Sequence, residues 1–420
     1  MPVSQYEASA LENYLNPLLD AANTSSWKHA LSILMINGTV LIADENFKTP
    51  CLISQTGLLD KVPKAMELLG AKGKANIMPL VTDAIKSFLP DMLIGLQQID
   101  STKSEDREPS QEEITKTVIT VFAPKIEKVS NVLTGMVVEG AFKVSDLAAV
   151  WLVDKLGQFR KNQIVSGISE QNYELMIDDL RRLDFIEPKL QVSLCPECLN
   201  YELTLSKYPS TRKICPRCGN DVVVMTLFLF KEGFGKLKSK NQDLPLFISA
   251  YLKQKLSFFS FLGEPMGIYP LEQINLQDVQ NSKVEVDVRV PKLNIGIECK
   301  LSEIPVAPMT QQRANSTAAN LLDQMRNYLK VGVKDIVIVT NLPKENLEKM
   351  NNALKIQLGN SPLPMTYALV SGDIDELICY LNSLADCMAK NMSEEFSRSF
   401  KKPVVETQDI KKVTDKEAGA

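Results

Sequence analysis

The chain has 420 residues, which is too long for one ordinary hydrophobic core and predicts several domains of roughly 100–200 residues each. A hydrophobic content of 45% and a charged content of 23% are typical of globular proteins, and the formal net charge of −4 excludes a chain that is basic throughout. A nucleic-acid partner would therefore need a local basic patch. The sequence has no basic-then-apolar signal pattern at its start and no apolar run as long as a membrane span, so we expect a cytoplasmic protein without a membrane partner.

Histidine occurs once, at His29, and it lies far in sequence from the other polar clusters. A single histidine excludes a multi-histidine metal site and makes a Ser-His-Asp triad very strained. Any chemistry must therefore use carboxylates, lysine, cysteine or tyrosine.

The N-terminal part predicts a small α+β domain without catalytic residues. A helical pattern covers residues 9–22, and two apolar runs within 30–45 follow it. The runs are joined by Asn37 and Gly38, a dipeptide that favours the tight turn of a β-hairpin. This pattern is typical of an interaction or regulatory domain.

Two amphipathic helices are predicted in the middle of the chain. The first covers 143–159, with Ser145 as its N-cap, and the second begins at Ser169, a further N-cap that lacks a complete capping box. A short apolar strand follows the second helix near residue 186.

Helices followed by short strands make residues 115–192 similar to a winged helix. In such folds the last helix often contacts DNA. Here that helix carries Asp178 and Asp179 beside Arg181 and Arg182, so contact with protein, or simple packing, stays equally open.

Four cysteines form two CPxC pairs with sixteen residues between them: Cys195, Cys198, Cys215 and Cys218. Each CxxC turn brings two thiolates to one ion, and the two turns together complete a tetrahedral sulfur site. The segment 201–206 between them has the pattern of a strand. The spacing resembles a zinc ribbon, which implies a structural Zn²⁺, because four thiolates leave no coordination position for water.

The loops of this ribbon carry charges of both signs, so contact with nucleic acid stays open. The basic residues favour phosphate binding and the acidic ones oppose it; they are Lys207, Arg212, Lys213 and Arg217, against Glu197, Glu202 and Asp221.

The other cysteines have no visible partner in the sequence. We expect Cys51, Cys379 and Cys387 to be buried as small apolar residues, and Cys299 to pack in the core.

A predicted β-hairpin near residue 290 combines acids with a lysine. Valines alternate with charged residues in 282–290, residues 291–294 form a turn, and 295–301 returns as an apolar strand. Alternation places Glu298 and Lys300 on one face, apart from Ile297 and Cys299.

Facing carboxylates are costly unless a cation neutralises them, and Asp287 on the first strand would face Glu298 on the second. Mg²⁺ prefers such oxygen ligands, and a neighbouring lysine can position water or stabilise phosphate charge. Charges that simply pair across an exposed hairpin are the alternative.

Asp287, Glu298 and Lys300 resemble the acid and ExK residues of the PD-(D/E)xK, or restriction-endonuclease-like, nucleases. A helical pattern over 310–332 follows, and its Gln324 and Tyr328 match the QxxxY signature of the RecB-like branch. The segment 334–341 then supplies the next strand, in the order that this fold requires.

The resemblance implies roles for these residues. Asp287, Glu298 and the backbone carbonyl of Cys299 would hold Mg²⁺ or Mn²⁺, Lys300 would position or activate water, and Gln324 and Tyr328 would support the site. The family usually has a further acid on a preceding helix, whereas residues 244–262 contain no acid. Glu264 and Glu272 follow that segment, and Glu272 is preferred.

These patterns together predict a multidomain α/β protein. It has a mainly helical N-terminal part with a β-hairpin, a central zinc ribbon, and a C-terminal restriction-endonuclease-like core in which a mixed sheet is flanked by helices. The expected segments are an N-terminal domain (1–99), a charged linker (100–114), a helical, winged-helix-like domain (115–192), the ribbon (193–224), the nuclease-like domain (236–388) and a disordered tail (389–420).

The resemblance implies a metal-dependent DNA endonuclease acting on double-stranded or branched DNA, in defence or repair. RNA stays open as a substrate, and one site per chain favours a homodimer for cutting both strands. The alternative is a non-catalytic DNA-binding or transcription-associated adaptor with a degenerate nuclease fold.

Overall fold

The structure is a computed structural model that describes residues 5–24, 26–44, 47–57, 144–164, 168–204, 213–257, 267–275 and 283–400. The linker predicted over 100–114 and the first part of the winged-helix-like segment lie outside these ranges. Within them, no helix is both long and apolar enough to cross a membrane.

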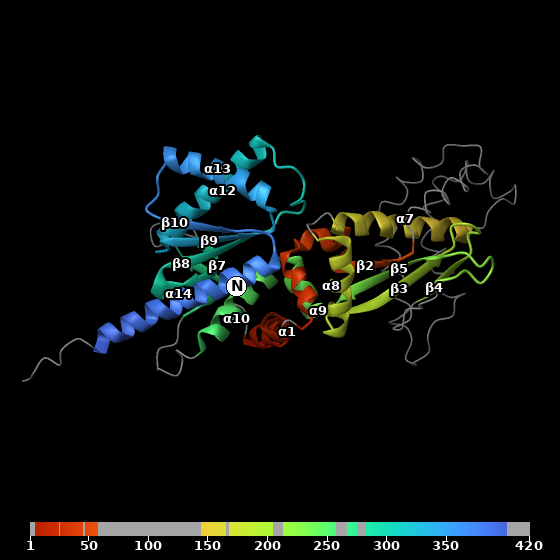
Figure 1. Cartoon of the computed structure of the whole chain (residues 1–420), viewed down its shortest axis with the longest axis horizontal. Helices are drawn as coiled ribbons and strands as arrows, with labels where there is room; N and C mark the ends of the chain where they lie inside the picture. The colour runs from red at the N-terminus through yellow and green to blue at the C-terminus, as the bar shows by residue number, and fades with distance from the viewer. Residues whose placement is uncertain are drawn as a thin grey trace, which may run out of the picture.

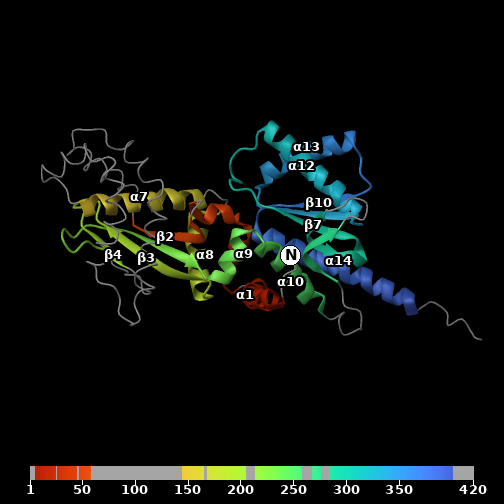
Figure 2. The same ribbon diagram turned by 180° about the vertical axis from the view of Figure 1, so that it is seen from behind.

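Two five-stranded sheets lie along the long axis of the molecule, with helices packed around and between them (Figures 1 and 2). The first sheet has the strand order β1-β2-β5-β3-β4, and all of its pairs are antiparallel. Its strands are β1 (Ile42–Asp44), β2 (Phe47–Thr56), β3 (Ile186–Leu194), β4 (Tyr201–Thr204) and β5 (Val223–Phe230).

The first sheet joins segments from three parts of the sequence. β5 lies between β2 and β3 and is buried along its whole length, in keeping with its nearly continuous apolar sequence VVMTLFLF. β3 is an inner strand of this sheet, since it pairs antiparallel with the short β4 over residues 191–194 and with β5 along most of its length, and the winged-helix interpretation of 115–192 stays a prediction. The long antiparallel pairing with β5 sets its position.

The helices of this half are α1 (Gln5–Thr24), α7 (Val144–Ile164), α8 (Glu170–Arg182) and α9 (Glu232–Ser239). α8 begins as predicted, since the Ser169 side chain accepts a hydrogen bond from the Asn172 backbone N–H. Ser145 lies inside α7 and is not its N-cap, because the helix already begins at Val144.

The tight hairpin turn predicted at Asn37-Gly38 is wrong. These residues connect two 3₁₀ helices, η1 (Lys28–Met35) and η2 (Gly38–Leu41). Asn37 has φ −66°, whereas a type I′ turn needs positive φ, and its side chain caps η2 by accepting from Thr39 N. Gly38 is required for close approach, since a Cβ there would lie 1.8 Å from the carbonyl oxygen of Lys238. The actual antiparallel pair, β1 and β2, follows later.

The second sheet has the order β10-β9-β8-β7-β6 and is mixed: the pairs β8–β9 and β9–β10 are parallel, and β6–β7 and β7–β8 are antiparallel. Its strands are β6 (Tyr269–Asn275), β7 (Lys283–Val290), β8 (Ile295–Lys300), β9 (Asp335–Thr340) and β10 (Thr366–Val370). A one-turn 3₁₀ helix, η4 (Pro291–Leu293), connects β7 and β8. The predicted mixed sheet flanked by helices is therefore confirmed.

Helices cover both faces of the second sheet (Figure 1). On β9, Ile336 and Ile338 pack into one cluster with α12 (Gln311–Lys330) and α13 (Lys344–Asn360). Val337 and Val339 point the other way, into a cluster that includes α10 (Asp243–Lys255) and α14 (Ile374–Phe400). The second cluster also takes in α1, η1 and parts of the first sheet, so the two sheets share one core.

α14 corrects two expectations. It continues to Phe400, so residues 389–400 are helical and not a disordered tail, since extending a nucleated helix is cheaper than starting one. Cys379 and Cys387 are exposed on it and not buried, whereas Cys51 is buried as expected.

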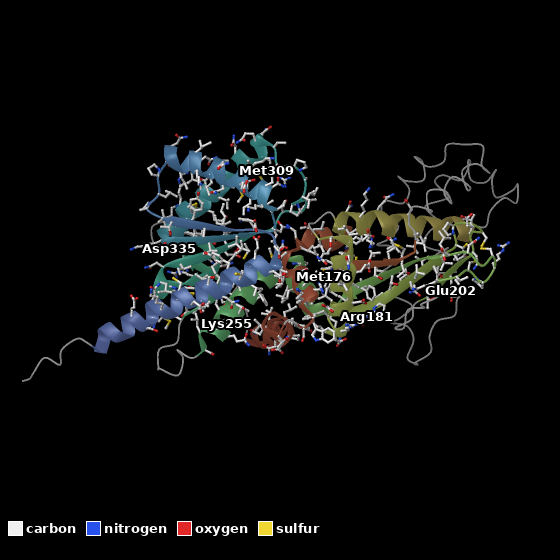
Figure 3. The ribbon with its side chains drawn as sticks, viewed as in Figure 1. Met176, Arg181, Glu202, Lys255, Met309 and Asp335 are labelled. Carbon is white, nitrogen blue, oxygen red and sulfur yellow. The ribbon has the colours of Figure 1, made fainter. Side chains whose placement is uncertain are left out.

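The charged side chains of α8 contact other groups of the same protein. Asp179 is buried and accepts a hydrogen bond from the backbone N–H of His29, and the guanidinium of Arg182 lies 5.2 Å from the centre of the Trp27 ring. Arg181, labelled in Figure 3, lies 3.7 Å from Asp178. These contacts favour a packing role for α8.

Candidate functional site

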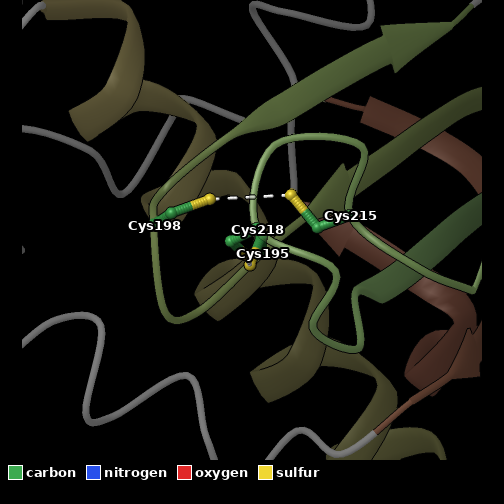
Figure 4. A group of neighbouring side chains, drawn as sticks. All are labelled: Cys195, Cys198, Cys215 and Cys218. Atoms are coloured by element: carbon green, nitrogen blue, oxygen red, sulfur yellow. Dashed lines mark hydrogen bonds between the residues drawn. The ribbon is translucent and has the colours of Figure 1, made fainter.

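Four cysteines form a compact cluster at the ends of β3, β4 and β5 (Figure 4). The four Sγ atoms all lie within 4.8 Å of one another. The separations are 3.4 Å for Cys195–Cys218 and 3.6 Å for Cys198–Cys215, far longer than a disulfide bond. Zn–S bonds of about 2.3 Å in a tetrahedron place sulfur atoms about 3.8 Å apart. The cluster therefore fits a structural Zn²⁺ site, as the spacing predicted.

The two CPxC turns have matching backbone geometry. In each turn the residue after the second cysteine donates its N–H to the carbonyl of the first: Leu199 to Cys195 at 2.9 Å, and Gly219 to Cys215 at 2.9 Å. Both donors have positive φ, 58° for Leu199 and 74° for Gly219. Such repeated knuckles present paired thiols to one point, which is the geometry that a four-thiolate ion needs.

One thiol of this cluster, that of Cys215, has a lowered pKa. Burial opposes the thiolate of Cys215, but the backbone N–H groups of Arg217 and Cys218 favour it more strongly and lower the pKa of Cys215 to about 7. By contrast, burial raises the pKa of Cys198 to about 12. A bound cation would be needed to hold all four residues as thiolates.

A second polar cluster forms where β7 and β8 separate. The strand register pairs Val288–Val290 with Ile295–Ile297, and Asp287 comes next along β7. At this point a side chain takes the place of a backbone hydrogen bond between the two strands: Asp287 Oδ2 accepts the Cys299 backbone N–H at 2.7 Å. This bond fixes the Asp287 side chain between the strands and leaves Oδ1 as its oxygen for another ligand.

Glu298 lies beside it, 2% exposed, with a protein group at each oxygen. Lys300 Nζ lies 2.6 Å from Glu298 Oε1, and the hydroxyl of Tyr328 on α12 donates to Glu298 Oε2. Tyr328 OH also accepts the backbone N–H of Asp287 at 3.4 Å. The tyrosine therefore connects both acidic residues, and Lys300, half-exposed, is the part of the site nearest solvent.

Close approach of Tyr328 depends on Gly296. A Cβ at that position would lie 3.1 Å from the tyrosine ring, and 3.0 Å from Val333. The predicted alternation along β8 is confirmed, since Ile297 and Cys299 pack into the large core while Glu298 turns toward α12.

Burial and neighbouring charges shift the pKa values of three groups in this cluster. Burial, and then the charge of Glu298, raise the pKa of Asp287 to about 7. Burial and the two carboxylates also raise the pKa of Tyr328, so its hydroxyl stays a donor. Burial opposes the Lys300 cation, but the adjacent Glu298 more than offsets this and raises the pKa of Lys300. The cluster is arranged to hold positive charge.

The remaining predicted site residues are placed differently. Gln324 is half-buried one turn before Tyr328 on α12. Glu272 pairs with Arg289 at 3.2 Å, which engages its carboxylate, and Glu264 lies outside the described residues. Among the residues that the structure describes, the four cysteines form the one group in which three or more ligand atoms are close enough to bind a single ion. Asp287 and Glu298 are therefore a pair without a third acid in ligand range.

Asp243 is an acid that the sequence interpretation missed, directly before the predicted helix 244–262. It is fully buried at the start of α10 and forms an ion pair with Lys238 at 2.8 Å. Its Oδ1 is buried without a hydrogen-bond partner among the described residues. Its charge helps to raise the pKa of Cys299, after burial and the charges of Asp287 and Glu298, so it lies near β8. Its position in the first turn of that helix was the feature of the sequence that could have identified it.

No protein-family model, no curated protein and no solved structure matches this chain.

Proposed function

We propose that this chain is a metal-dependent endonuclease that hydrolyses DNA phosphodiester bonds at Asp287, Glu298 and Lys300. The observation that carries the proposal is the convergence of two carboxylates from adjacent strands beside a half-exposed lysine. Strand, strand, helix and strand follow in the order β7, β8, α12 and β9, which is the order of the PD-(D/E)xK nucleases. The C-terminal half would then belong to that superfamily.

Each residue has a distinct part. Asp287, through Oδ1, and Glu298 would hold Mg²⁺ or Mn²⁺, with the carbonyl of Cys299 as a further ligand. When bound, the cation would polarise the phosphate and favour ionisation of the attacking water. Lys300 would move from Glu298 to a phosphate oxygen, where its cation stabilises charge that develops in the transition state. Tyr328 would orient Glu298 through its hydroxyl, and Gln324 would support the same face of α12.

The four-cysteine site has a different role in this proposal. Its Zn²⁺ would fasten the ends of β3, β4 and β5 and would take no part in hydrolysis, since four thiolates leave no open position. Lys213 and Arg217 are exposed there and would contact DNA phosphates.

A non-catalytic DNA-binding adaptor is the second candidate. Two observations favour it: both oxygens of Glu298 have protein partners, and among the described residues no third acid lies within ligand range of the pair. An adaptor would keep this arrangement as a neutralised ion pair and would not bind Mg²⁺.

Cleavage of DNA separates these two candidates. Linear, circular, single-stranded and branched DNA would be incubated with the zinc-loaded protein and Mg²⁺ or Mn²⁺. The proposal expects cleavage that is lost in Asp287→Ala and Lys300→Ala and retained in Lys283→Ala, an exposed lysine on the same strand as Asp287. Cleavage by Asp287→Ala or Lys300→Ala at the wild-type rate would refute the site, and RNA in parallel reactions decides between the nucleic acids.

A further inference from the structure

The loop of residues 301–310, between β8 and α12, starts directly after Lys300 and exposes two apolar side chains. Ile304 is 49% exposed and Val306 is 46% exposed, whereas Pro305 between them is buried. Both side chains are therefore open to solvent within three residues of chain. Met309, labelled in Figure 3, anchors its far end in the core.

One buried asparagine holds the tip of this loop. Asn346, 4% exposed on α13, donates from Nδ2 to the carbonyls of Pro305 at 2.7 Å and Ala307 at 2.9 Å. Its Oδ1 accepts the backbone N–H of Met309 at 3.1 Å. The backbone on both sides of Val306 is thus fixed to a helix.

The start of the loop is held as firmly. Asn341, also 4% exposed, exchanges two hydrogen bonds with the backbone of Ser302, both 2.8 Å long. Asn37 reaches across from the N-terminal segment and donates from Nδ2 to the carbonyl of Leu301 at 2.6 Å. The backbone on both sides of Ile304 is therefore fixed, at Ser302 and at Pro305.

Two cations stand at the start of the loop. Lys300 precedes the loop with its side chain half-exposed, and Arg313 after it donates to the Ser302 hydroxyl at 2.9 Å. The acid of the loop, Glu303, accepts a hydrogen bond from the Thr39 hydroxyl at 2.9 Å. An apolar tip beside two cations is complementary to nucleic acid, in which phosphates lie next to stacked bases.

Resting on the proposed function, we propose that Ile304 and Val306 form a wedge that unstacks bases beside the phosphate to be cut. Four residues span at most about 14 Å, so Ile304 lies within about four base steps of Lys300. Inserted apolar side chains unstack base steps at an energetic cost that is lowest where pairing is already broken. The preferred substrate is therefore DNA with a branch, flap or mismatch, rather than uniform duplex.

The wedge can be tested by the fluorescence of 2-aminopurine placed at a branch point, with Ca²⁺ in place of Mg²⁺ so that binding is observed without cleavage. Binding of wild-type protein is expected to raise the fluorescence as the base unstacks. The double variant Ile304→Ala/Val306→Ala is expected to lose this rise, and its preference for branched over duplex DNA in Mg²⁺ should fall about tenfold. Ile304→Met/Val306→Met should retain both, and so should Ile356→Ala, a 63%-exposed apolar residue on α13.

The outcomes separate the wedge from the nuclease. Cleavage by the wild type, with equal fluorescence for the wild type and the double alanine variant, would overturn the wedge and leave the nuclease intact. A fluorescence rise that depends on the two side chains, without cleavage in Mg²⁺ or Mn²⁺, would support the wedge and overturn the proposed hydrolysis. A wild-type protein that binds neither branched nor duplex DNA would overturn both.

Discussion

The four-cysteine cluster and the Asp287–Glu298 pair lie on different sheets and hold their ligand atoms in opposite ways. The cysteines come from two matching turns and present four equivalent sulfur atoms to one centre. The carboxylates come from two strands that separate, and an exposed lysine shares their space. A closed, uniform shell suits a structural ion, whereas the mixed cluster is where we propose that a catalytic cation binds. The following predictions test that contrast, from the largest expected effect to the smallest.

Removing one sulfur ligand should have the largest effect on stability. We expect Cys215→Ser to lose Zn²⁺, measured by elemental analysis, and to lower the Tm by about 10 °C or more, because zinc binding at such sites is strongly coupled to folding. Cys379→Ser, an exposed cysteine on α14, is the matched control and should keep both values. Full stability of Cys215→Ser without zinc would show that the cluster is not a structural centre.

Removing the lysine should abolish activity without affecting the zinc site. Lys300→Ala is expected to slow DNA cleavage by about 10²–10⁴-fold, the range for loss of a positioned charged or proton-transferring group, while the zinc content stays unchanged. Rate measurements under single-turnover conditions check this. A loss of less than about twofold would contradict the role of Lys300 in the transition state.

The two acids should make stability depend on pH when no divalent cation occupies their site. The pKa of Asp287 in the folded protein is raised from 3.8 to about 7, so the folded state binds its proton more tightly than the unfolded state. This contribution is fully present below about pH 4 and is lost as the pH rises through about 7. Urea unfolding of zinc-loaded protein without Mg²⁺ or Mn²⁺ should show this decline, on the order of 2–4 kcal/mol.

Asp287→Asn should remove that decline and be more stable than the wild type above pH 7. Asp335→Asn, an exposed acid at the start of β9, should keep the wild-type profile. Parallel profiles for the wild type and Asp287→Asn would mean that the two carboxylates do not compete for charge.

The tyrosine hydroxyl should matter less than the groups that it orients. Tyr328→Phe removes the donor to Glu298, and we expect affinity for Mg²⁺ and the cleavage rate to fall about 10–100-fold, as for other residues that orient ligands. Tyr367→Phe is the control: Tyr367 lies on β10 of the same sheet, and this change removes its hydrogen bond to Asn351 on α13. An unchanged rate in Tyr328→Phe would leave Tyr328 as a packing residue.

The smallest effect is expected at Glu272. Glu272→Gln breaks a partly exposed ion pair with Arg289 and should cost less than about 1 kcal/mol of stability, with cleavage unchanged. If Glu272→Gln abolished cleavage as Asp287→Asn does, Glu272 would be the missing first acid of the site.

The parts of the structure that local patterns determine were predictable from the sequence. The CPxC spacing gave the cysteine cluster, the alternation of valines gave β7, and the order of strands and helix placed Asp287, Glu298, Lys300 and Tyr328 together. Each of these depends on residues within one turn or hairpin, or on an order of elements that a mixed sheet permits in few ways.

The features that depend on distant contacts were not predictable. Asn37-Gly38 has the composition of a hairpin turn, but Gly38 is required by the carbonyl of Lys238 two hundred residues later. Likewise, the pairing of β2 with β5 and the ion pair of Glu272 with Arg289 depend on strand register, which no single segment specifies. Asp243 was missed because its burial and its pairing with Lys238 appear only after α9 and α10 pack.

Calorimetric titration of the zinc-loaded protein with Mn²⁺ tests the contrast between the two centres most directly. Wild-type protein should bind Mn²⁺ at concentrations up to the millimolar range, Asp287→Asn should reduce the heat to background, and Asp335→Asn should titrate as the wild type does. The same heat from wild type and Asp287→Asn, or no heat from either, would contradict an open metal site at Asp287 and Glu298.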